Sequence, residues 1–170
     1  MPGRTVQSVY RSPRSHEELH SFVANFGARC VRATTTCQLE NVVLRAVSAS
    51  RKDPSLSRML PVFLWRVRKN LNLEELTAKA VNKRRAQVLG YYLDLAGKVG
   101  STKAFSKSVK ALRPHVRADR PVFLFPETAK HPFEVFATKQ DVSDYARKWG
   151  LLARMPLEGY KSYFSKVAHL

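Results

Sequence analysis

Two consecutive helical patterns over residues 81–113 constrain the fold of this chain more than any other feature of its sequence. The first pattern ends at Gly100, because glycine is the residue that most readily interrupts a helix after proline. In the second pattern, Phe105, Val109 and Leu112 recur at the spacing of a single helix face. The opposite face carries Lys103, Lys107 and Lys110. This arrangement predicts a helix that buries one face in a core and presents positive charge on the other.

Helical patterns also dominate most of the remaining sequence. Ser15 is an N-cap candidate, and Glu18 three residues later completes a capping box. Asp53 followed by Pro54 predicts another helix start, because proline fits the first helical position. Asn72 is a third N-cap candidate. Further helices are expected from Thr35 or Thr36, after residue 138 and over residues 157–167. The chain is therefore predicted to be mainly α, as a single-domain helical bundle.

One stretch departs from the helical pattern. Residues 122–125 form a short apolar run between Pro121 and Pro126. Such a run is typical of an edge strand or an extended arm, because proline cannot donate a hydrogen bond to a sheet. Residues 133–137 are the segment expected to pair with it. We therefore predict a minor β-strand or extended arm near residues 121–137.

Chain length and sequence texture predict the domain organisation. A chain of 170 residues is long enough for one domain that buries about 70% of its unfolded surface. Residues 1–14 combine proline, glycine, serine and arginine without periodicity, which is typical of a mobile basic tail. Residues 15–170 are expected to form a single helical domain, and the change of pattern at residues 114–120 is a candidate boundary within it.

The chain is strongly basic, with thirty lysines and arginines, thirteen acids and a net charge of +17. A charge this far from zero favours a polyanionic partner, nucleic acid above all. The cations are spread along the chain, with a local peak within residues 98–120, where seven lysines and arginines are opposed by Asp119 alone. They are expected to contact phosphates, and the alternative is an ordinary solvated helix face. The candidate nucleic-acid-binding residues are Arg84, Arg85, Lys98, Lys103, Lys107, Lys110, Arg113 and Arg117.

Residues 82–97, with the sequence NKRRAQVLGYYLDLAG, join a basic start to an apolar helix. This stretch resembles the end of the effector region of AbiEi-type antitoxins, the regulators of type IV toxin–antitoxin systems. In that family a basic helix runs into a Leu-Gly-Tyr-Leu-Leu-Glu-Leu-like segment. The resemblance extends at most over residues 55–113. It implies a non-enzymatic, DNA-binding, autoregulatory protein with a nucleotidyltransferase toxin as partner, and it carries over only Arg84 and Arg85 as phosphate contacts.

Residues 16–20 match the H-E-x-x-H pattern of zinc hydrolases. On a helix this pattern places His16 and His20 one turn apart as zinc ligands, with Glu17 as general base. A catalytic zinc needs a third protein ligand, and the alternative is an ordinary solvated helix face. Thirteen acids, most of them at expected helix starts, provide poorly for catalysis by carboxylates or metal. We therefore predict no catalytic residue and no cofactor, and zinc binding by the two histidines remains a third hypothesis.

The remaining sequence features concern compartment and partners. Two cysteines are too few for a disulfide scaffold, and no eighteen apolar residues run together, so a cytoplasmic protein with no membrane partner is predicted. The leading hypothesis is non-catalytic binding of nucleic acid, with DNA as the expected polymer, by an antitoxin-like transcriptional regulator. The alternative is a protein-interaction module, an immunity factor or adaptor, for an acidic protein. The tyrosines either stack on bases or belong to the core, and they include Tyr91, Tyr92, Tyr160 and Tyr163.

Overall fold

The computed structural model describes residues 13–25, 38–117 and 119–167. Most of these residues are helical, which confirms the predicted mainly α fold with a minor strand. The helices are α1 (His16–Asn25), α2 (Leu39–Ala49), α3 (Pro54–Val67), α4 (Leu73–Asn82), α5 (Ala86–Val99), α6 (Ser106–Leu112), α7 (Pro132–Gln140), α8 (Asp144–Lys148) and α9 (Leu157–Val167). The short elements are the 3-10 turns η1 (Arg113–His115) and η2 (Pro126–Lys130) and the strands β1 (Val122–Phe123) and β2 (Leu151–Leu152). Within the described residues, no helix combines the length and apolar character that a membrane span requires.

Some predicted features lie outside the described residues. They are residues 1–12 of the predicted basic tail, the helix start at Thr35 or Thr36, and both cysteines, Cys30 and Cys37. The last two residues of the predicted tail are described. Pro13 is buried, and the Arg45 guanidinium of α2 donates hydrogen bonds to the carbonyl oxygens of Pro13 and Arg14. The chain is therefore held against α2 just before α1 begins.

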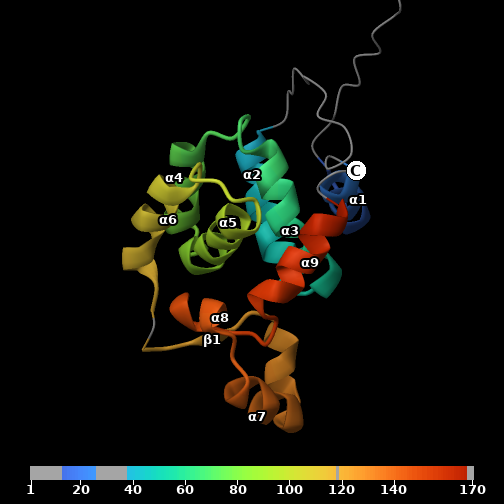
Figure 1. The fold of residues 1–170 in the computed structure, drawn as a ribbon, viewed down its shortest axis with the longest axis vertical. Coiled ribbons are helices and arrows are strands. Elements are labelled where there is room, and N and C mark those ends of the chain that lie inside the picture. The colour runs from blue at the N-terminus through green and yellow to red at the C-terminus, as the bar shows by residue number, and fades with distance from the viewer. Residues whose placement is uncertain (1–12, 26–37, 118, 168–170) are drawn as a thin grey trace, which may run out of the picture.

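Helices α3 and α5 pack against each other at the centre of the molecule (Figure 1). Helices α1 and α2 contact α3, whereas α4 and α6 lie on the other side of α5. The last helix, α9, contacts both central helices. Leu60, Phe63 and Leu64 of α3 are almost completely buried, as are Leu89 and Leu93 of α5. Each such side chain stabilises the fold by roughly 1.5–3 kcal/mol relative to an exposed position. The two helices therefore form the centre of a core that the surrounding helices complete.

Two glycines let α5 lie directly against tryptophan side chains. A Cβ atom at Gly90 would overlap the six-membered ring of Trp149, which is fully buried. A Cβ atom at Gly100 would overlap the indole ring of Trp65. Helix α5 ends at Val99 with Gly100 as its C-cap, so the predicted break at Gly100 is confirmed, but α5 begins at Ala86 and not at residue 81, which belongs to α4. Close packing against Trp65 gives the physical reason for glycine at the break.

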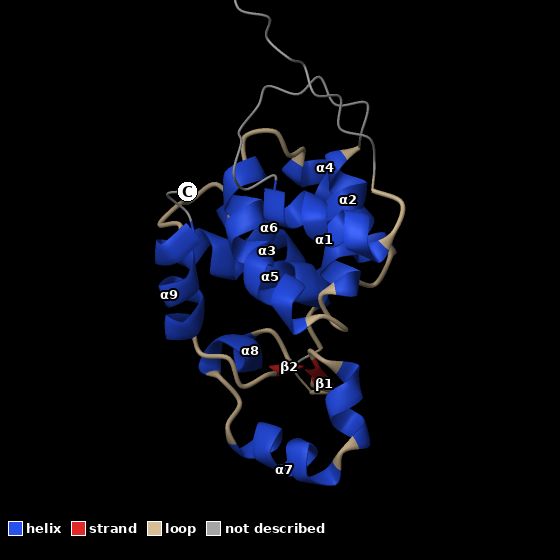
Figure 2. Ribbon diagram, turned by 90° about the vertical axis from the view of Figure 1, so that its right-hand side faces the viewer, coloured by secondary structure: helices blue, strands red, loops and turns tan. Residues whose placement is uncertain are grey.

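The predicted strand is present, but its predicted partner is wrong. Strand β1 pairs in parallel with β2, so that Val122 lies opposite Leu151 and Phe123 opposite Leu152 (Figure 2). Residues 133–137, the expected partner, belong to α7. Pro132 suits the first position of that helix, because its missing N–H is not needed there. Figures 1 and 2 show α7 at one end of the molecule, beyond the strands and α8.

The predicted helix caps are confirmed. Ser15 Oγ accepts a hydrogen bond of 3.1 Å from the N–H of Glu18. Asp53 Oδ1 accepts hydrogen bonds from the first turn of α3, and Asn72 Oδ1 accepts one of 3.1 Å from the first turn of α4. Each cap satisfies backbone N–H groups that have no partner within their own helix. These local signals therefore fix where three of the helices begin.

Replacing Asp53 with alanine is expected to lower the free energy of unfolding by about 1–2 kcal/mol at neutral pH, because α3 loses its N-cap. Partial burial raises the pKa of Asp53, but hydrogen bonds from Leu56, His16 and Ser55 outweigh it and hold the pKa below its usual value. A carboxylate with a lowered folded-state pKa stabilises the fold above its unfolded pKa. That contribution is lost as the pH falls through the folded pKa.

Urea denaturation of the Asp53→Ala variant at pH 7 and at about pH 3 checks this expectation, and the deficit should be smaller at the lower pH. Glu17→Ala removes an exposed acid of the neighbouring helix α1 and serves as the control. It is expected to change the stability by less than about 0.5 kcal/mol. A deficit that is the same at both pH values would contradict the role given to the Asp53 carboxylate.

Candidate nucleic-acid interface

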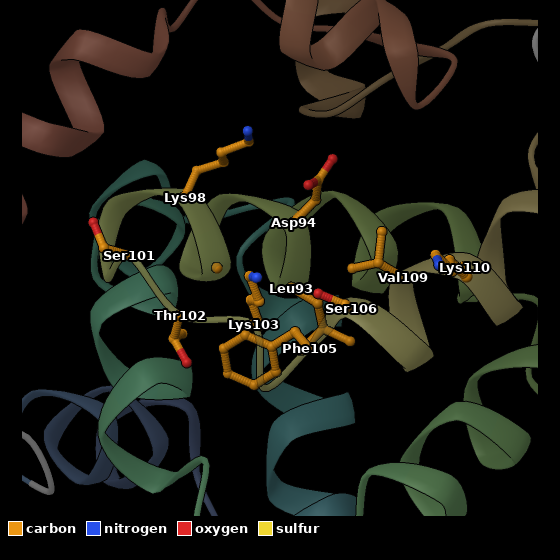
Figure 3. Close-up of a pocket in the computed structure, with 11 residues that line it drawn as sticks. Leu93, Asp94, Lys98, Ser101, Thr102, Lys103, Phe105, Ser106, Val109 and Lys110 are labelled. Atoms are coloured by element: carbon orange, nitrogen blue, oxygen red, sulfur yellow. The ribbon is translucent and has the colours of Figure 1, made fainter.

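A cavity of about 510 Å³ lies between α5 and α6, beside the connection that joins them (Figure 3). Its apolar lining consists of Leu93 and Phe105, which are almost fully buried, and the half-buried Val109. Its polar surface combines three ammonium groups with three hydroxyl groups, from Lys98, Lys103, Lys110, Ser101, Thr102 and Ser106. Ammonium and hydroxyl groups are both hydrogen-bond donors to phosphate oxygens. The cavity therefore brings together donors that suit an anionic ligand.

The connection between α5 and α6 is a tight turn that sets the position of the lysines. Ser101 adopts a left-handed backbone conformation with φ of 47°, and the N–H of Thr102 donates a 2.9 Å hydrogen bond to the carbonyl oxygen of Gly97. Phe105 is almost fully buried, and its packing fixes the position of the end of the turn that leads into α6. As a result, Lys98 comes from the end of α5, Lys103 from the turn and Lys110 from α6 (Figure 3).

The predicted row of Lys103, Lys107 and Lys110 along one helix is wrong. Helix α6 begins only at Ser106, so Lys103 precedes it. Lys107 lies away from the cavity and forms an ion pair of 2.5 Å with Glu74 of α4. The hydrogen bond and charge of Lys107 lower the pKa of Glu74, and Glu74 in turn raises the pKa of Lys107. Lys107 is therefore partly neutralised. Of the predicted row, only Lys103 and Lys110 line the cavity.

Asp94 contributes a carboxylate to the cavity. Side chains of α8 and of Trp149, the residue after α8, donate hydrogen bonds to that carboxylate. Its oxygen atoms accept hydrogen bonds of 2.8 Å from Lys148 Nζ, 3.0 Å from Trp149 Nε1 and 3.4 Å from the Tyr145 hydroxyl. Burial and the nearby Asp94 raise the pKa of Tyr145, so this hydroxyl stays a neutral donor. The negative charge of Asp94 is thus compensated by Lys148, and within the described residues none of the three cavity lysines forms an ion pair.

Replacing Asp94 with asparagine is expected to have opposite effects on binding and on stability. The cavity becomes more positive, so the affinity for a polyanion should rise roughly threefold to tenfold at low salt. The ion pair with Lys148 is lost, so the free energy of unfolding should fall by about 1 kcal/mol. Fluorescence anisotropy with a labelled oligonucleotide and urea denaturation measure the two effects.

Asp144→Asn is the matched control for this prediction. It also removes one negative charge, but from an exposed side chain on α8 that does not line the cavity. In this control, neither the affinity for the oligonucleotide nor the equilibrium constant of unfolding should change by more than about a factor of two. A weaker affinity for the polyanion in the Asp94→Asn variant would contradict the placement of phosphates at the cavity.

The positive surface continues from the cavity over α8. The Arg113 guanidinium lies 5.1 Å from the centre of the Trp149 ring and donates a hydrogen bond to the carbonyl oxygen of Lys148. Trp149 and Lys148 in turn donate to Asp94, which lines the cavity, so Arg113 and Lys148 are connected to the cavity through Asp94 and Trp149 without lining it. We refer to the following five residues as the cationic cluster: Lys98, Lys103, Lys110, Arg113 and Lys148. Lys148 was not among the predicted binding residues, because only tertiary packing brings it to Asp94.

The other predicted binding residues lie outside the cationic cluster. Arg84 is exposed between α4 and α5, in a left-handed backbone conformation with φ of 54°. Arg85 is half-buried and donates a 3.1 Å hydrogen bond from Nη1 to the carbonyl oxygen of Leu44, which fastens α5 to α2. Arg117 is exposed after η1, and its carbonyl group lies close to Gly150. The structure therefore gathers four of the eight predicted residues, Lys98, Lys103, Lys110 and Arg113.

Three of the four tyrosines considered for base stacking belong to the core. Tyr91, Tyr92 and Tyr160 are almost completely buried. The Tyr91 hydroxyl donates to that of Tyr160 at 3.2 Å, and the hydroxyl groups of Tyr92 and Ser57 are 2.7 Å apart. The core interpretation is confirmed for these three residues. Among the described residues, the large aromatic side chains that are instead exposed are those of Phe133 and Phe136 on α7, at 78% and 61%.

The two histidines of the H-E-x-x-H segment contact separate residues at the start of α3. His16 Nε2 lies 3.2 Å from Asp53 Oδ2, and His20 Nε2 lies 3.2 Å from Ser55 Oγ. Within the part of the chain that the structure describes, no three histidine, cysteine, aspartate or glutamate side chains are grouped as metal ligands. In this arrangement the histidines hold α1 against the first turn of α3.

Comparison with known proteins finds no matching family model, and no curated protein or solved structure matches the chain significantly.

Proposed function

We propose that this chain is a non-catalytic nucleic-acid-binding protein that contacts phosphates through the cationic cluster. The observation that carries the proposal is the set of three lysines around one cavity whose carboxylate, Asp94, is already paired with Lys148. The net charge of +17 adds a long-range attraction for any polyanion. Both features favour a partner with many phosphates over a small neutral ligand.

The cationic cluster suits contacts to the nucleic-acid backbone rather than reading of bases. Lysine side chains bind phosphate as point charges and release the counterions that surround the polymer. Contacts of this kind fix position on the polymer but carry no sequence information. Most of the affinity is therefore expected to be independent of sequence and strongly dependent on salt.

A salt titration of the purified, nuclease-treated protein tests the proposal. Binding to labelled duplex DNA, single-stranded DNA and RNA of equal length is followed by fluorescence anisotropy at several salt concentrations. Four phosphate contacts, from the cluster members other than Lys148, which is paired with Asp94, predict that log K falls with log salt with a slope of roughly −4 for duplex DNA. No binding at low salt, or binding that does not change with salt, would overturn the proposal.

A finer proposal is that the chain is an antitoxin-like transcriptional regulator acting in the cytoplasm. It is supported by the resemblance of residues 82–97 to AbiEi-type antitoxins, with a nucleotidyltransferase toxin as the expected partner. The DNA upstream of its own gene should then bind at least about tenfold more tightly than a shuffled duplex of the same composition. Equal affinity for the two duplexes would remove the regulator proposal and leave general nucleic-acid binding in place.

A second candidate function is that of an interaction module for an acidic protein. Helix α7 exposes Phe133 and Phe136 three residues apart, between Lys130 and Lys139. Large exposed aromatic side chains of this kind are common at protein interfaces, where they are often the main contributors to affinity. A defined complex that survives nuclease treatment and is lost in the Phe133→Ala, Phe136→Ala double variant would favour this function. Its absence would leave nucleic-acid binding as the sole proposal.

A further inference from the structure

The cavity between α5 and α6 is concave, whereas phosphates along a nucleic-acid duplex lie on a convex surface. Its volume of about 510 Å³ falls within the range of small-ligand pockets. Leu93 and Phe105 are almost fully buried beneath it, Val109 is half-buried at its edge, and the lysines come from two helices and the turn between them. A flat cationic face would be sufficient to hold a polymer backbone. A cavity of this size is suited to a single group that enters it.

The charge of the cavity selects for a doubly charged group. Lys98, Lys103 and Lys110 line the cavity together with a single carboxylate, Asp94, which is already paired with Lys148 at 2.8 Å. An internal phosphodiester carries one negative charge, whereas a terminal phosphomonoester carries about −1.5 to −2 at pH 7 and has three acceptor oxygens. The monoester therefore matches three ammonium groups better than the diester does.

We propose that this cavity binds the phosphorylated end of a nucleic-acid strand, with the terminal phosphate at the three lysines that line it. The inference rests on the proposed function, because it specifies which part of the polymer the same site holds. Hydroxyl groups of Ser101, Thr102 and Ser106 supply further donors to the phosphate oxygens. Duplex backbone outside the cavity then lies within reach of Arg113 and Lys148, the other members of the cationic cluster.

The test compares oligonucleotides of one sequence that carry a 5′-phosphate, a 3′-phosphate or hydroxyl groups at both ends. Fluorescence anisotropy at moderate salt measures the three affinities. One phosphorylated end is expected to bind roughly tenfold more tightly than the hydroxyl form, because it gains charged hydrogen bonds. The preference should shrink at about pH 5, where the phosphate loses its second charge. A nucleoside monophosphate is tested as competitor to separate strand ends from free nucleotides.

Two variants locate the effect, because both remove exposed lysines of the cavity. Lys103→Gln and Lys110→Gln should each reduce the preference for the phosphorylated end to about twofold or less, while the hydroxyl strand still binds. Lys161→Gln on α9 is the matched control and should keep the full preference. A preference that both cavity variants retain would place the terminal phosphate elsewhere and overturn the inference.

The outcomes separate this inference from the function on which it rests. Equal binding of phosphorylated and hydroxyl strands would overturn the inference and leave the proposed function standing. No binding of any strand at low salt would overturn both. A nucleoside monophosphate that binds as tightly as the phosphorylated strand would assign the cavity to free nucleotides and overturn the choice of a strand end.

Discussion

Charge reversal of the three cavity lysines, by Lys98→Glu, Lys103→Glu and Lys110→Glu together, is expected to weaken nucleic-acid binding by roughly 100-fold to 1,000-fold at low salt. Three charged hydrogen bonds to phosphate are lost, and three carboxylates repel the polymer from the same place. All three side chains are exposed, and none of them forms an ion pair within the described residues, so the fold should tolerate the change. Anisotropy titration with one labelled oligonucleotide measures the effect.

The control for this prediction has the same net charge but places the new acids elsewhere. Lys69→Glu, Lys139→Glu and Lys161→Glu reverse three exposed lysines that do not line the cavity. If binding depends on the cationic cluster, the affinity of the control for the oligonucleotide should fall by less than about tenfold, because only long-range charge has changed. Similar losses in the two triple variants would mean that the total charge, not the cavity, determines affinity.

Trp149→Ala is expected to lower the free energy of unfolding by about 3–5 kcal/mol, the range typical of deleting a large buried aromatic side chain. Trp149 is fully buried, fills the space that Gly90 leaves on α5, and donates a 3.0 Å hydrogen bond from Nε1 to Asp94. Its ring also lies under the Arg113 guanidinium. Its removal opens a void on α5 and leaves Asp94 without one donor.

Urea denaturation measures this loss of stability, and two further variants separate its causes. Trp149→Phe keeps a ring but lacks the N–H group, so it should cost about 1–3 kcal/mol. Phe136→Ala deletes an aromatic side chain that is 61% exposed, and it should cost less than about 0.5 kcal/mol. A Trp149→Ala variant as stable as Phe136→Ala would contradict the role of Trp149 as a buried side chain that packs on α5 and donates to Asp94.

Features of the fold that depend on nearby residues could be predicted from the sequence. The caps at Ser15, Asp53 and Asn72 act on backbone groups two or three residues away, and they mark the starts of α1, α3 and α4 as expected. The partner of β1 could not be predicted, because two-residue strands carry almost no pattern of their own. Residues 133–137 were wrongly assigned to it, although Pro132 and the spacing of the apolar residues suit a helix.

The same distinction applies to the candidate site. Lys98, Lys103 and Lys110 are close in sequence, and a dense run of cations was sufficient to select them. Asp94 and Lys148 are 54 residues apart, so their ion pair at the cavity follows only from the packing of α8 on α5. Lys107 was selected by its spacing, yet Glu74 of α4, which is 33 residues distant, binds it on another side of α6. The density of cations in the sequence was sufficient to predict the cavity lysines. Which other residues lie beside them depends on tertiary contacts and could not be predicted.

The most direct test of the central claim is the salt dependence of binding in three proteins. They are the wild type, the cavity variant Lys98→Gln, Lys103→Gln, Lys110→Gln, and the control variant Lys69→Gln, Lys139→Gln, Lys161→Gln. Each lysine that contacts a phosphate contributes about 0.7–0.9 to the slope of log K against log salt. The cavity variant should therefore show a slope that is shallower by about 2 to 3, and the control should match the wild type. Equal slopes in all three proteins would contradict phosphate binding at this cavity.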